Sequence, residues 1–356
     1  TRYRQFETIK TQLDKIDNGD YRVKDYQKYI SNNAPLTIGT NSFSIFSSNV
    51  DERNFTATRF FGYFGNNNTS VSSASASANY PQPMIFADCI MGYKYYVVSN
   101  SKVKDLDKFP YLSKLDIKTN YYVVYKNLAV LPNAIVTASP IDESGTWAQK
   151  YEALYKLYGG SGDYFEEDTL DKVTFDQNSG LYKLQIFKND GGWVFLECNF
   201  PEEYDVYISN RADSKVFDEY KAKANDGINI VSHNPSTAVF LKNYSNVEID
   251  VTTINKYVKV KYLSDMNVAH KMITLSETAE KNAGKLKLSA GRFEIKANAK
   301  TSGEYLFLNY VALDGHQAYV NGKKVQMKKN FLNFMEIPLE EGENTVVITY
   351  KSPYVK

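Results

Sequence analysis

The chain has 356 residues, of which 43% are hydrophobic, so it is long enough for two globular domains and too apolar to be disordered. Its 42 Lys and Arg residues almost balance its 41 Asp and Glu residues, which leaves a formal net charge of +1. This balance argues against the concentrated basic surface that nucleic-acid binding requires, and we expect no nucleic-acid partner.

The N-terminal part is predicted to combine one helix with several strands. Apolar residues recur at spacings of three and four and predict an amphipathic helix that Gly19 ends, with a stripe of Tyr3, Phe6, Ile9, Leu13 and Ile16. A short strand is expected at residues 21–23, followed by a loop at 41–64 and a flexible polar segment at 65–78. Three further strands are expected at residues 93–99, 121–125 and 128–138.

A second helix is predicted over residues 147–158. Thr146 and Gln149 have the spacing of a capping box, in which each side chain bonds the other's backbone N–H. Its apolar stripe consists of Trp147, Tyr151, Leu154 and Tyr158. The glycine-rich residues 159–162 follow and end the helix.

From about Asp171 the pattern changes to short strands separated by turns such as Asp314-Gly315 and Asn321-Gly322. Strands are expected at residues 182–187, 193–199, 206–209, 237–241, 247–252, 257–262, 285–288, 292–297, 304–311, 318–320 and 345–350. We therefore predict an α+β fold in three parts. Residues 1–140 form a mixed α/β region, residues 141–170 a helical connector, and residues 171–356 an all-β part, a jelly-roll or immunoglobulin-like sandwich or two stacked ones.

No motif in the sequence predicts catalysis or metal binding. None of His233, His270 and His316 has a neighbour at metal-ligand spacing, and neither a Gly-x-Ser-x-Gly elbow nor a phosphate loop is present. The acidic residues 166–168 and the lysine-rich residues 323–329 are interpreted as solvated faces. We expect no catalytic residue, no metal site and no cofactor.

Three other features leave alternatives open. Cys89 and Cys198 lie in apolar contexts and are either buried thiols or, in an oxidising compartment, a disulfide. The 29 Tyr residues reflect either an AT-rich genome or selection for sugar contact. The sequence shows neither a signal-peptide pattern nor an 18-residue apolar run, which fits a soluble protein and equally a loop domain excised from between membrane segments.

The C-terminal segment resembles a known family. Residues 306–310 (Leu-Phe-Leu-Asn-Tyr) precede residues 314–324 (Asp-Gly-His-Gln-Ala-Tyr-Val-Asn-Gly-Lys-Lys), and a last strand ends at Tyr350. This resembles the last strands of the YfhO family, where a pattern similar to Gly-Trp-x-x-x-Val-Asn/Asp-Gly-Lys precedes a Gly-ended turn, a final strand and a closing transmembrane helix. His316 stands where the family often has Trp, which weakens any transfer of a packing or sugar-stacking role.

The N-terminal half resembles the same family in the same order. Tyr21-Arg22-Val23 is similar to its opening strand, and residues 42–48 are similar to its Ser-rich stretch. Residues 91–98 are similar to a Leu-Gly-Val-Lys-Tyr strand of the family, and residues 127–134 to an Asn…Leu-Pro strand. The order and spacing hold over essentially the whole chain.

The resemblance implies a polytopic membrane protein of the C-type glycosyltransferase class. Such enzymes transfer a sugar from a lipid-phosphate carrier, outside the membrane, to a cell-wall polymer such as the teichoic acid of Gram-positive bacteria. Their catalytic carboxylate lies on loops beside the membrane helices. Those loops are not part of this chain. We therefore expect a non-catalytic extracytoplasmic domain of the cell membrane, flanked by transmembrane helices, that recognises the acceptor glycopolymer or the lipid-linked sugar, or that shields the active site.

The binding residues expected on the membrane-proximal side are Tyr21, Arg22, Ser47, Ser48 and Asn49. Arg22 would pair with a phosphate of the donor or the polymer, or it would form a structural ion pair within the fold. Two other interpretations stay open. One is a secreted carbohydrate-binding or adhesion protein, and the other is a glycosidase, which would need two carboxylates about 5 to 10 Å apart.

Overall fold

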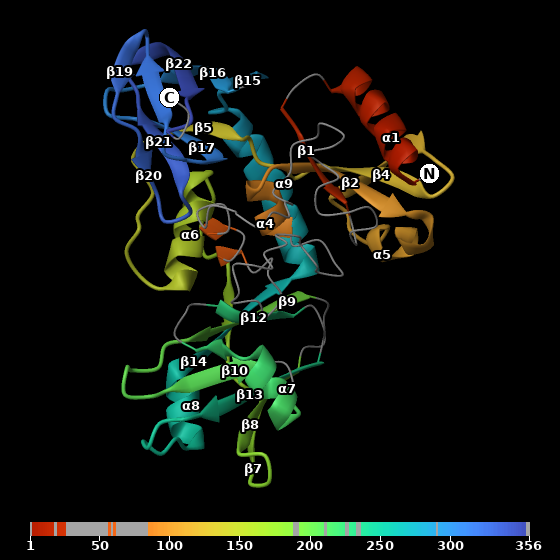
Figure 1. The fold of residues 1–356 in the computed structure, drawn as a ribbon, viewed down its shortest axis with the longest axis vertical. Coiled ribbons are helices and arrows are strands. Elements are labelled where there is room, and N and C mark those ends of the chain that lie inside the picture. The colour runs from red at the N-terminus through yellow and green to blue at the C-terminus, as the bar shows by residue number, and fades with distance from the viewer. Residues whose placement is uncertain are drawn as a thin grey trace.

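The computed structural model describes residues 2–17, 20–25, 56–57, 60–61, 85–187, 192–209, 212–224, 228–232, 236–289 and 291–353. These residues form three units that contain sheets, arranged around a group of helices (Figure 1). The expected α+β class is confirmed. The boundaries at residues 140 and 170 stay predictions.

The N-terminal unit is a sheet of four strands in the order β1-β2-β4-β3, with helices on both faces. Its elements are α1 (Arg2–Ile16), β1 (Arg22–Asp25), β2 (Tyr93–Ser99), η2 (Asn100–Lys102), α5 (Val103–Leu106), β3 (Leu112–Lys118) and β4 (Tyr122–Asn127). Successive strand residues point to opposite faces. Tyr95 therefore packs with Leu13 of α1 on one face, and Tyr96 packs with Leu106 of α5 on the other.

The lower sandwich, at the bottom of Figure 1, consists of a sheet in the order β11-β10-β13-β8-β7 and a sheet in the order β12-β9-β14-β6. Its elements are β6 (Glu166–Asp168), β7 (Lys172–Asp176), β8 (Leu181–Phe187), β9 (Gly192–Cys198), β10 (Val206–Ser209), α7 (Ser214–Tyr220), β11 (Ala222–Lys223), β12 (Ile228–Ser232), β13 (Ser236–Asn243), α8 (Val251–Tyr257) and β14 (Val258–Ser264). Alternating residues such as Leu184, Leu196 and Leu241 meet between the sheets as its core.

The upper sandwich contains the C-terminal strands and one strand from much earlier in the chain. Its elements are β5 (Ala134–Thr137), β15 (Lys285–Ser289), β16 (Arg292–Ala299), β17 (Tyr305–Val311), β18 (His316–Val320), β19 (Lys323–Val325), β20 (Lys328–Lys329), β21 (Phe334–Pro338) and β22 (Gly342–Tyr350). The two sheets have the orders β15-β16-β22-β18-β19 and β20-β21-β17-β5. Asn321 and Gly322 have φ values of 50° and 81°, so the predicted hairpin turn between β18 and β19 is confirmed.

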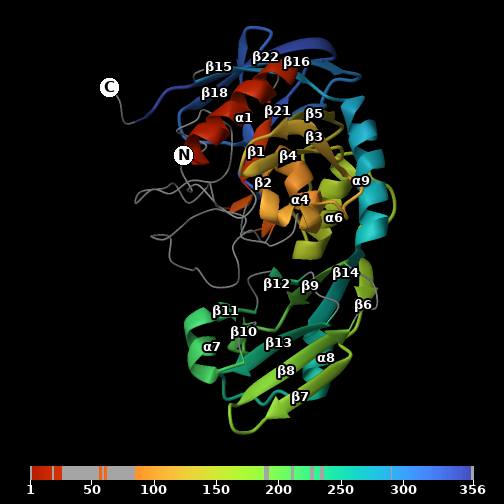
Figure 2. The same ribbon diagram turned by 90° about the vertical axis from the view of Figure 1, so that its right-hand side faces the viewer.

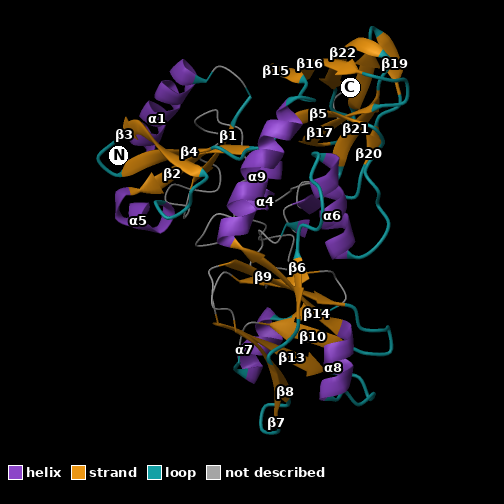
Figure 3. Ribbon diagram, turned by 180° about the vertical axis from the view of Figure 1, so that it is seen from behind, coloured by secondary structure: helices purple, strands orange, loops and turns teal. Residues whose placement is uncertain are grey.

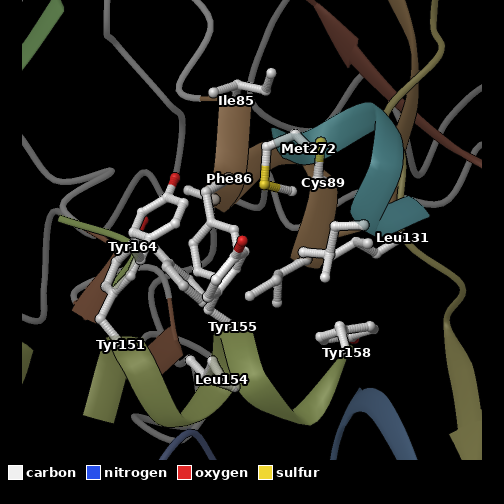
Figure 4. Close-up of a cluster of buried hydrophobic side chains, with 14 of the residues drawn as sticks. Ile85, Phe86, Cys89, Leu131, Tyr151, Leu154, Tyr155, Tyr158, Tyr164 and Met272 are labelled. Atoms are coloured by element: carbon white, nitrogen blue, oxygen red, sulfur yellow. The ribbon is translucent and has the colours of Figure 1, made fainter. Parts of the chain in front are cut away.

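Three helices lie between these units: α4 (Ile85–Ile90), α6 (Trp147–Leu157) and α9 (Asp265–Glu280). In Figure 2, α9 runs along one edge of the molecule from the lower to the upper sandwich, and Figure 3 shows α6 and α9 between the sheets. The predicted stripe of α6 is buried, and its rings form an aromatic cluster with residues of α4 (Figure 4). The ring centroid of Tyr151 lies 4.7 Å from those of both Phe86 and Trp147.

The segment after residue 171 is not all β, as the sequence analysis expected, because α7, α8 and α9 lie within it. The strand expected at residues 247–252 is wrong, since Asp250 is the N-cap of α8 and accepts a hydrogen bond from the Thr253 N–H. Helix α9 does carry a periodic signal: Val268, Met272, Leu275 and Ala279 are buried along one face. Short polar and β-branched residues between them obscured that stripe.

Cys89 and Cys198 are buried and form no disulfide, and they belong to different cores. Cys89 lies in the aromatic centre of the molecule, whereas Cys198 lies between the sheets of the lower sandwich. Burial raises the pKa of the Cys89 thiol well above its usual range, which keeps it protonated and unreactive. Of the two alternatives that the sequence left open, the structure therefore has the buried thiols.

Replacing Thr146 should destabilise α6 through its cap. The predicted capping box is present, with the Thr146 hydroxyl accepting from the Gln149 N–H and the Gln149 side chain accepting from the Thr146 N–H. We expect Thr146→Ala to lower the free energy of unfolding by about 1 kcal/mol, measured by urea denaturation. Thr146→Ser keeps the hydroxyl and serves as the control, so an equal loss in both variants would contradict the prediction.

His316 lies within the upper sandwich at the position where the YfhO-like pattern has Trp. Its ring is 5.0 Å from that of Tyr350, and its Nδ1 accepts a hydrogen bond of 2.9 Å from the Leu313 N–H. Burial lowers the pKa of the imidazole, and the nearby Lys329 charge acts in the same direction. The imidazole is therefore used as a neutral, aromatic packing residue, as a Trp would be.

Because the folded state disfavours protonation of His316, the unfolded chain binds the proton more readily. Stability from this group is present above the unfolded pKa of about 6.5 and is lost as the pH falls below it. We expect the free energy of unfolding of the unmodified chain to fall between pH 7.5 and 5.5 by more than that of His316→Phe. Equal pH dependence of the two proteins in urea denaturation would contradict this.

Candidate functional site

The predicted binding residues that the structure describes lie inside the molecule. Tyr21 is 7% exposed and its hydroxyl donates to the Asp14 carboxylate of α1. Arg22 is 3% exposed. Ser47, Ser48 and Asn49 lie outside the described residues, so their proposed role stays a prediction.

The Arg22 guanidinium is held by backbone carbonyls from two distant segments. Its Nη1 donates to the Met91 carbonyl at 2.7 Å, and its Nη2 donates to the Asn309 carbonyl at 3.0 Å. Its Cζ lies 4.3 Å from the ring centroid of Tyr310, within range of a cation–π interaction. Bonds from a charged donor are among the stronger hydrogen bonds in proteins, and burial protects these from water.

Asp20 completes this group, which we call the Arg22 cluster (Asp20, Arg22, Asn133, Asn309 and Tyr310). The Asp20 carboxylate accepts from the Tyr310 hydroxyl and from the Asn133 amide, each at 2.5 Å. The Asn309 amide donates to the Asn133 side-chain oxygen at 2.8 Å. Burial raises the pKa of the Tyr310 hydroxyl well above its usual range, so that it stays a donor.

The Arg22 cluster joins four segments that the YfhO-like patterns had marked separately: residues 21–23, 91–98, 127–134 and 306–310. Gly92 is the close-packed point between them. It has φ of +68°, and a Cβ there would lie 2.1 Å from the Asn133 Oδ1. The contacts give Arg22 a structural role through carbonyl acceptors. The structural ion pair and the phosphate contact that the sequence analysis offered both stay predictions.

A solvent-accessible cleft of ≈770 Å³ lies elsewhere, along the side of α6 that faces away from the aromatic cluster. One wall is the helix face of Gln149, Glu152, Ala153, Lys156 and Leu157. The other is the segment 136–144, which leaves β5 and leads to the start of α6, and Asn282 after α9 also lines the cleft. The volume is in the range of small-molecule sites in proteins.

The wall opposite α6 is fixed by the upper sandwich. The Ile141 N–H donates to the carboxylate of Glu336 on β21 at 2.9 Å, and Glu336 is buried. The Thr137 hydroxyl donates to the Ser139 carbonyl at 3.0 Å. Asp142 accepts from both the Ser144 N–H and the Ser144 hydroxyl through one oxygen, and these bonds lower its pKa. Asp142 is therefore held as an anion, and none of the hydrogen bonds among the described residues uses its other oxygen.

Glu152 connects the cleft to the lower sandwich. One of its carboxylate oxygens accepts from the N–H groups of Tyr164 and Phe165, at 2.7 and 3.1 Å, just before β6. Its other oxygen is buried without a hydrogen-bond partner among the described residues. A buried acceptor in this state costs free energy that a donor hydroxyl would recover.

A second hollow of ≈250 Å³ shares Gly159 with the cleft. It lies between the end of α6 and α9, where His270, Lys271 and Thr274 line it together with Tyr155. The Lys271 ammonium donates to the Asp163 carbonyl at 3.1 Å. Polar groups therefore continue from the cleft towards α9.

The sequence analysis did not predict the cleft. Its residues come from β5, the following loop, α6 and the turn after α9, so no local pattern joins them. The one available signal was the polar face of α6, which alternates with the predicted aromatic stripe. Within the described ranges, no group of three or more His, Cys, Asp or Glu residues could hold a metal ion.

Removing the Arg22 guanidinium should destabilise the fold. We expect Arg22→Met to lower the free energy of unfolding by about 3 kcal/mol, because two carbonyls lose a charged, buried donor. Urea denaturation would measure this. The control is Arg292→Met, since the Arg292 side chain is 47% exposed and its loss should change stability by no more than about 0.5 kcal/mol. Equal losses in the two variants would contradict the role of the cluster.

Comparison with known proteins places the chain in a family. The family model described as "Bacterial membrane protein YfhO" matches residues 1–356. A protein of Bacillus subtilis (strain 168), named "Uncharacterized protein YfhO", is 22% identical over 384 residues that include 100% of this chain. The chain spans 43% of the length of that relative.

The solved structure of PA5104, a conserved protein of unknown function from Pseudomonas aeruginosa PAO1, covers 52% of this chain and 93% of its own, at 10% identity. Its TM-score of 0.15 is too low to indicate a shared fold. None of the described helices is long and apolar enough to cross a bilayer. The family match covers every residue, and the chain belongs to the YfhO family of bacterial membrane proteins.

Proposed function

We propose that this chain is an extracytoplasmic domain of a membrane protein that glycosylates a cell-wall polymer such as lipoteichoic or teichoic acid. In this proposal the domain is not the catalytic part. It binds the acceptor polymer in the cleft along α6 and holds it for a transfer centre beside flanking transmembrane helices. The family membership and the cleft support the proposal.

The observation that carries the proposal is the chemical mixture on the cleft walls. Ala153, Leu157 and Ile141 offer apolar surface, while Asp142, Lys156, Gln149 and Asn282 offer groups that bond hydroxyls. Sugars and polyols present the same mixture, with C–H faces between hydroxyl groups. A few convergent polar groups among apolar ones are typical of sites that bind such ligands.

Lys156 and Asp142 have complementary roles in this model of binding. Lys156 is exposed on α6 and is suited to a phosphate of the polymer through a charge-assisted hydrogen bond. Asp142 is held by Ser144 and is anionic, so it accepts from ligand hydroxyls. Both walls are braced by carboxylates, which keeps the cleft preorganised. The buried Glu336 holds the segment opposite α6 from behind, and the half-buried Glu152, itself part of the α6 wall, holds the backbone before β6.

Isothermal titration calorimetry with short glycerol-phosphate oligomers tests the proposal. We expect binding by the 356-residue chain, and a loss of about tenfold in affinity for Lys156→Ala and for Asp142→Asn, since each removes one hydrogen bond with a charged partner.

The matched control is Lys118→Ala, an exposed lysine of β3 that does not line the cleft. Its affinity should equal that of the unmodified chain. The absence of heat at millimolar oligomer, or equal weakening by Lys118→Ala and Lys156→Ala, would overturn the assignment of the cleft.

A further inference from the structure

Strands β15 and β16 place several cations on the outer face of the upper sandwich, at the top of Figure 1. Leu286 and Ile295 point inwards and pack in the core of this sandwich. Residues alternate between the two faces of a strand, so Lys285, Lys287 and Lys296 point outwards, and all three are exposed.

The register of the hairpin sets two of these lysines against each other. Lys285 lies directly opposite Lys296 in the antiparallel pairing of β15 with β16. Like charges in that relation destabilise a sheet. An unfavourable like-charge pair that no other contact compensates is typical of functional positions.

Within the part of the chain that the structure describes, no carboxylate lies directly opposite Lys285 or Lys296 in the β15–β16 pairing. Glu294 lies opposite Lys287, but the ion pair that it forms is with Arg292, at 3.5 Å. None of the three lysines has a carboxylate within 4.0 Å among the described residues. The outer face of the hairpin is therefore a cationic surface.

The lysine-rich residues 323–329 behave differently, although they are denser in the sequence. Lys323 pairs with Glu340 at 3.1 Å, and Lys329 pairs with Asp314 at 3.2 Å. Lys328 lies 5.0 Å from the ring centroid of Tyr305. These local partners reduce the attraction of residues 323–329 for an external anion. The lysines of the β15–β16 hairpin keep their attraction for such an anion.

The neighbouring residues favour a water-soluble anion over a membrane surface. The next strand, β22, continues the same face with Thr345, the half-buried Val347 and Thr349. These residues lie opposite Lys296, Glu294 and Arg292, respectively. None of the large hydrophobic residues exposed in the described structure points outwards from β15 or β16. Proteins that lie on membranes combine a basic face with apolar side chains that insert into the bilayer.

We propose that the outer face of the β15–β16 hairpin is a binding site for an anionic chain with a phosphate in each repeat. Single contacts on an exposed surface contribute little, so affinity must sum over several phosphates. Lys285 and Lys287 are two residues apart, about 7 Å along the strand, and Lys296 is about 5 Å across from Lys285. The site shares no lining residue with the cleft and does not rest on the function proposed for it.

Binding of fluorescently labelled inorganic polyphosphate to the 356-residue chain, followed by anisotropy, tests this proposal. We expect affinity that falls steeply between about 50 and 200 mM salt, because binding releases counterions. Lys285→Ala/Lys296→Ala should weaken binding at least tenfold and flatten the salt dependence. Its melting temperature should not fall, since the substitution relieves a like-charge pair.

The control is Lys323→Ala/Lys329→Ala, which removes the same net charge from the same sandwich and should keep most of the affinity. Equal weakening by both double variants would overturn the site, as would a lack of binding at low salt. Binding to anionic vesicles without binding to polyphosphate would replace it with a membrane contact. Tighter binding to duplex DNA at equal phosphate concentration would also refute the proposal.

Discussion

The structure depends on the burial of one guanidinium group. Arg22 is almost fully enclosed and remains charged, so the fold must supply acceptors for its donors. They come from the turn after α4 and from β17, which are 69 and 287 residues away in the sequence. The N-terminal sheet and the upper sandwich are therefore held together by a short polar network rather than by apolar packing alone.

A second constraint is the aromatic centre, which positions the cleft. Trp147, Tyr151 and Leu154 turn one face of α6 inwards, and this orientation turns Gln149, Ala153 and Lys156 outwards. Glu152 ties the helix to the strand that begins the lower sandwich. The hydroxyls of Tyr158 and Tyr164 are buried without hydrogen-bond partners among the described residues. Burying these hydroxyls without hydrogen bonds costs free energy, so packing of the rings must hold the two side chains there.

Charge on this protein follows sheet register more than sequence density. In the segment with the most lysines, two of the four pair with carboxylates, Lys323 with Glu340 and Lys329 with Asp314. Lys285 and Lys296 are eleven residues apart, and pairing places them side by side. A formal net charge of +1 thus coexists with a local cationic face. The composition of a chain indicates the average charge of its surface, and it does not predict the charge of a single face.

The sequence by itself determined the local elements that periodicity and capping control. The helix with the Thr146–Gln149 capping box, the strand at residues 93–99 and the turn at Asn321-Gly322 are as predicted, because their signals lie within a few residues. The family resemblance was also readable, since its patterns are linear. Helix α9 was missed because polar and β-branched residues interrupt its stripe.

Only the tertiary structure decided where those elements meet. β5 pairs with β17 across 168 residues, and the cleft forms between the loop after β5 and α6. Long-range pairing of this kind leaves no trace in local propensity. The same limit applies to Arg22, for which the sequence offered a phosphate contact or a structural ion pair. Burial and the placement of two distant carbonyls gave it structural partners, and neither is encoded near residue 22.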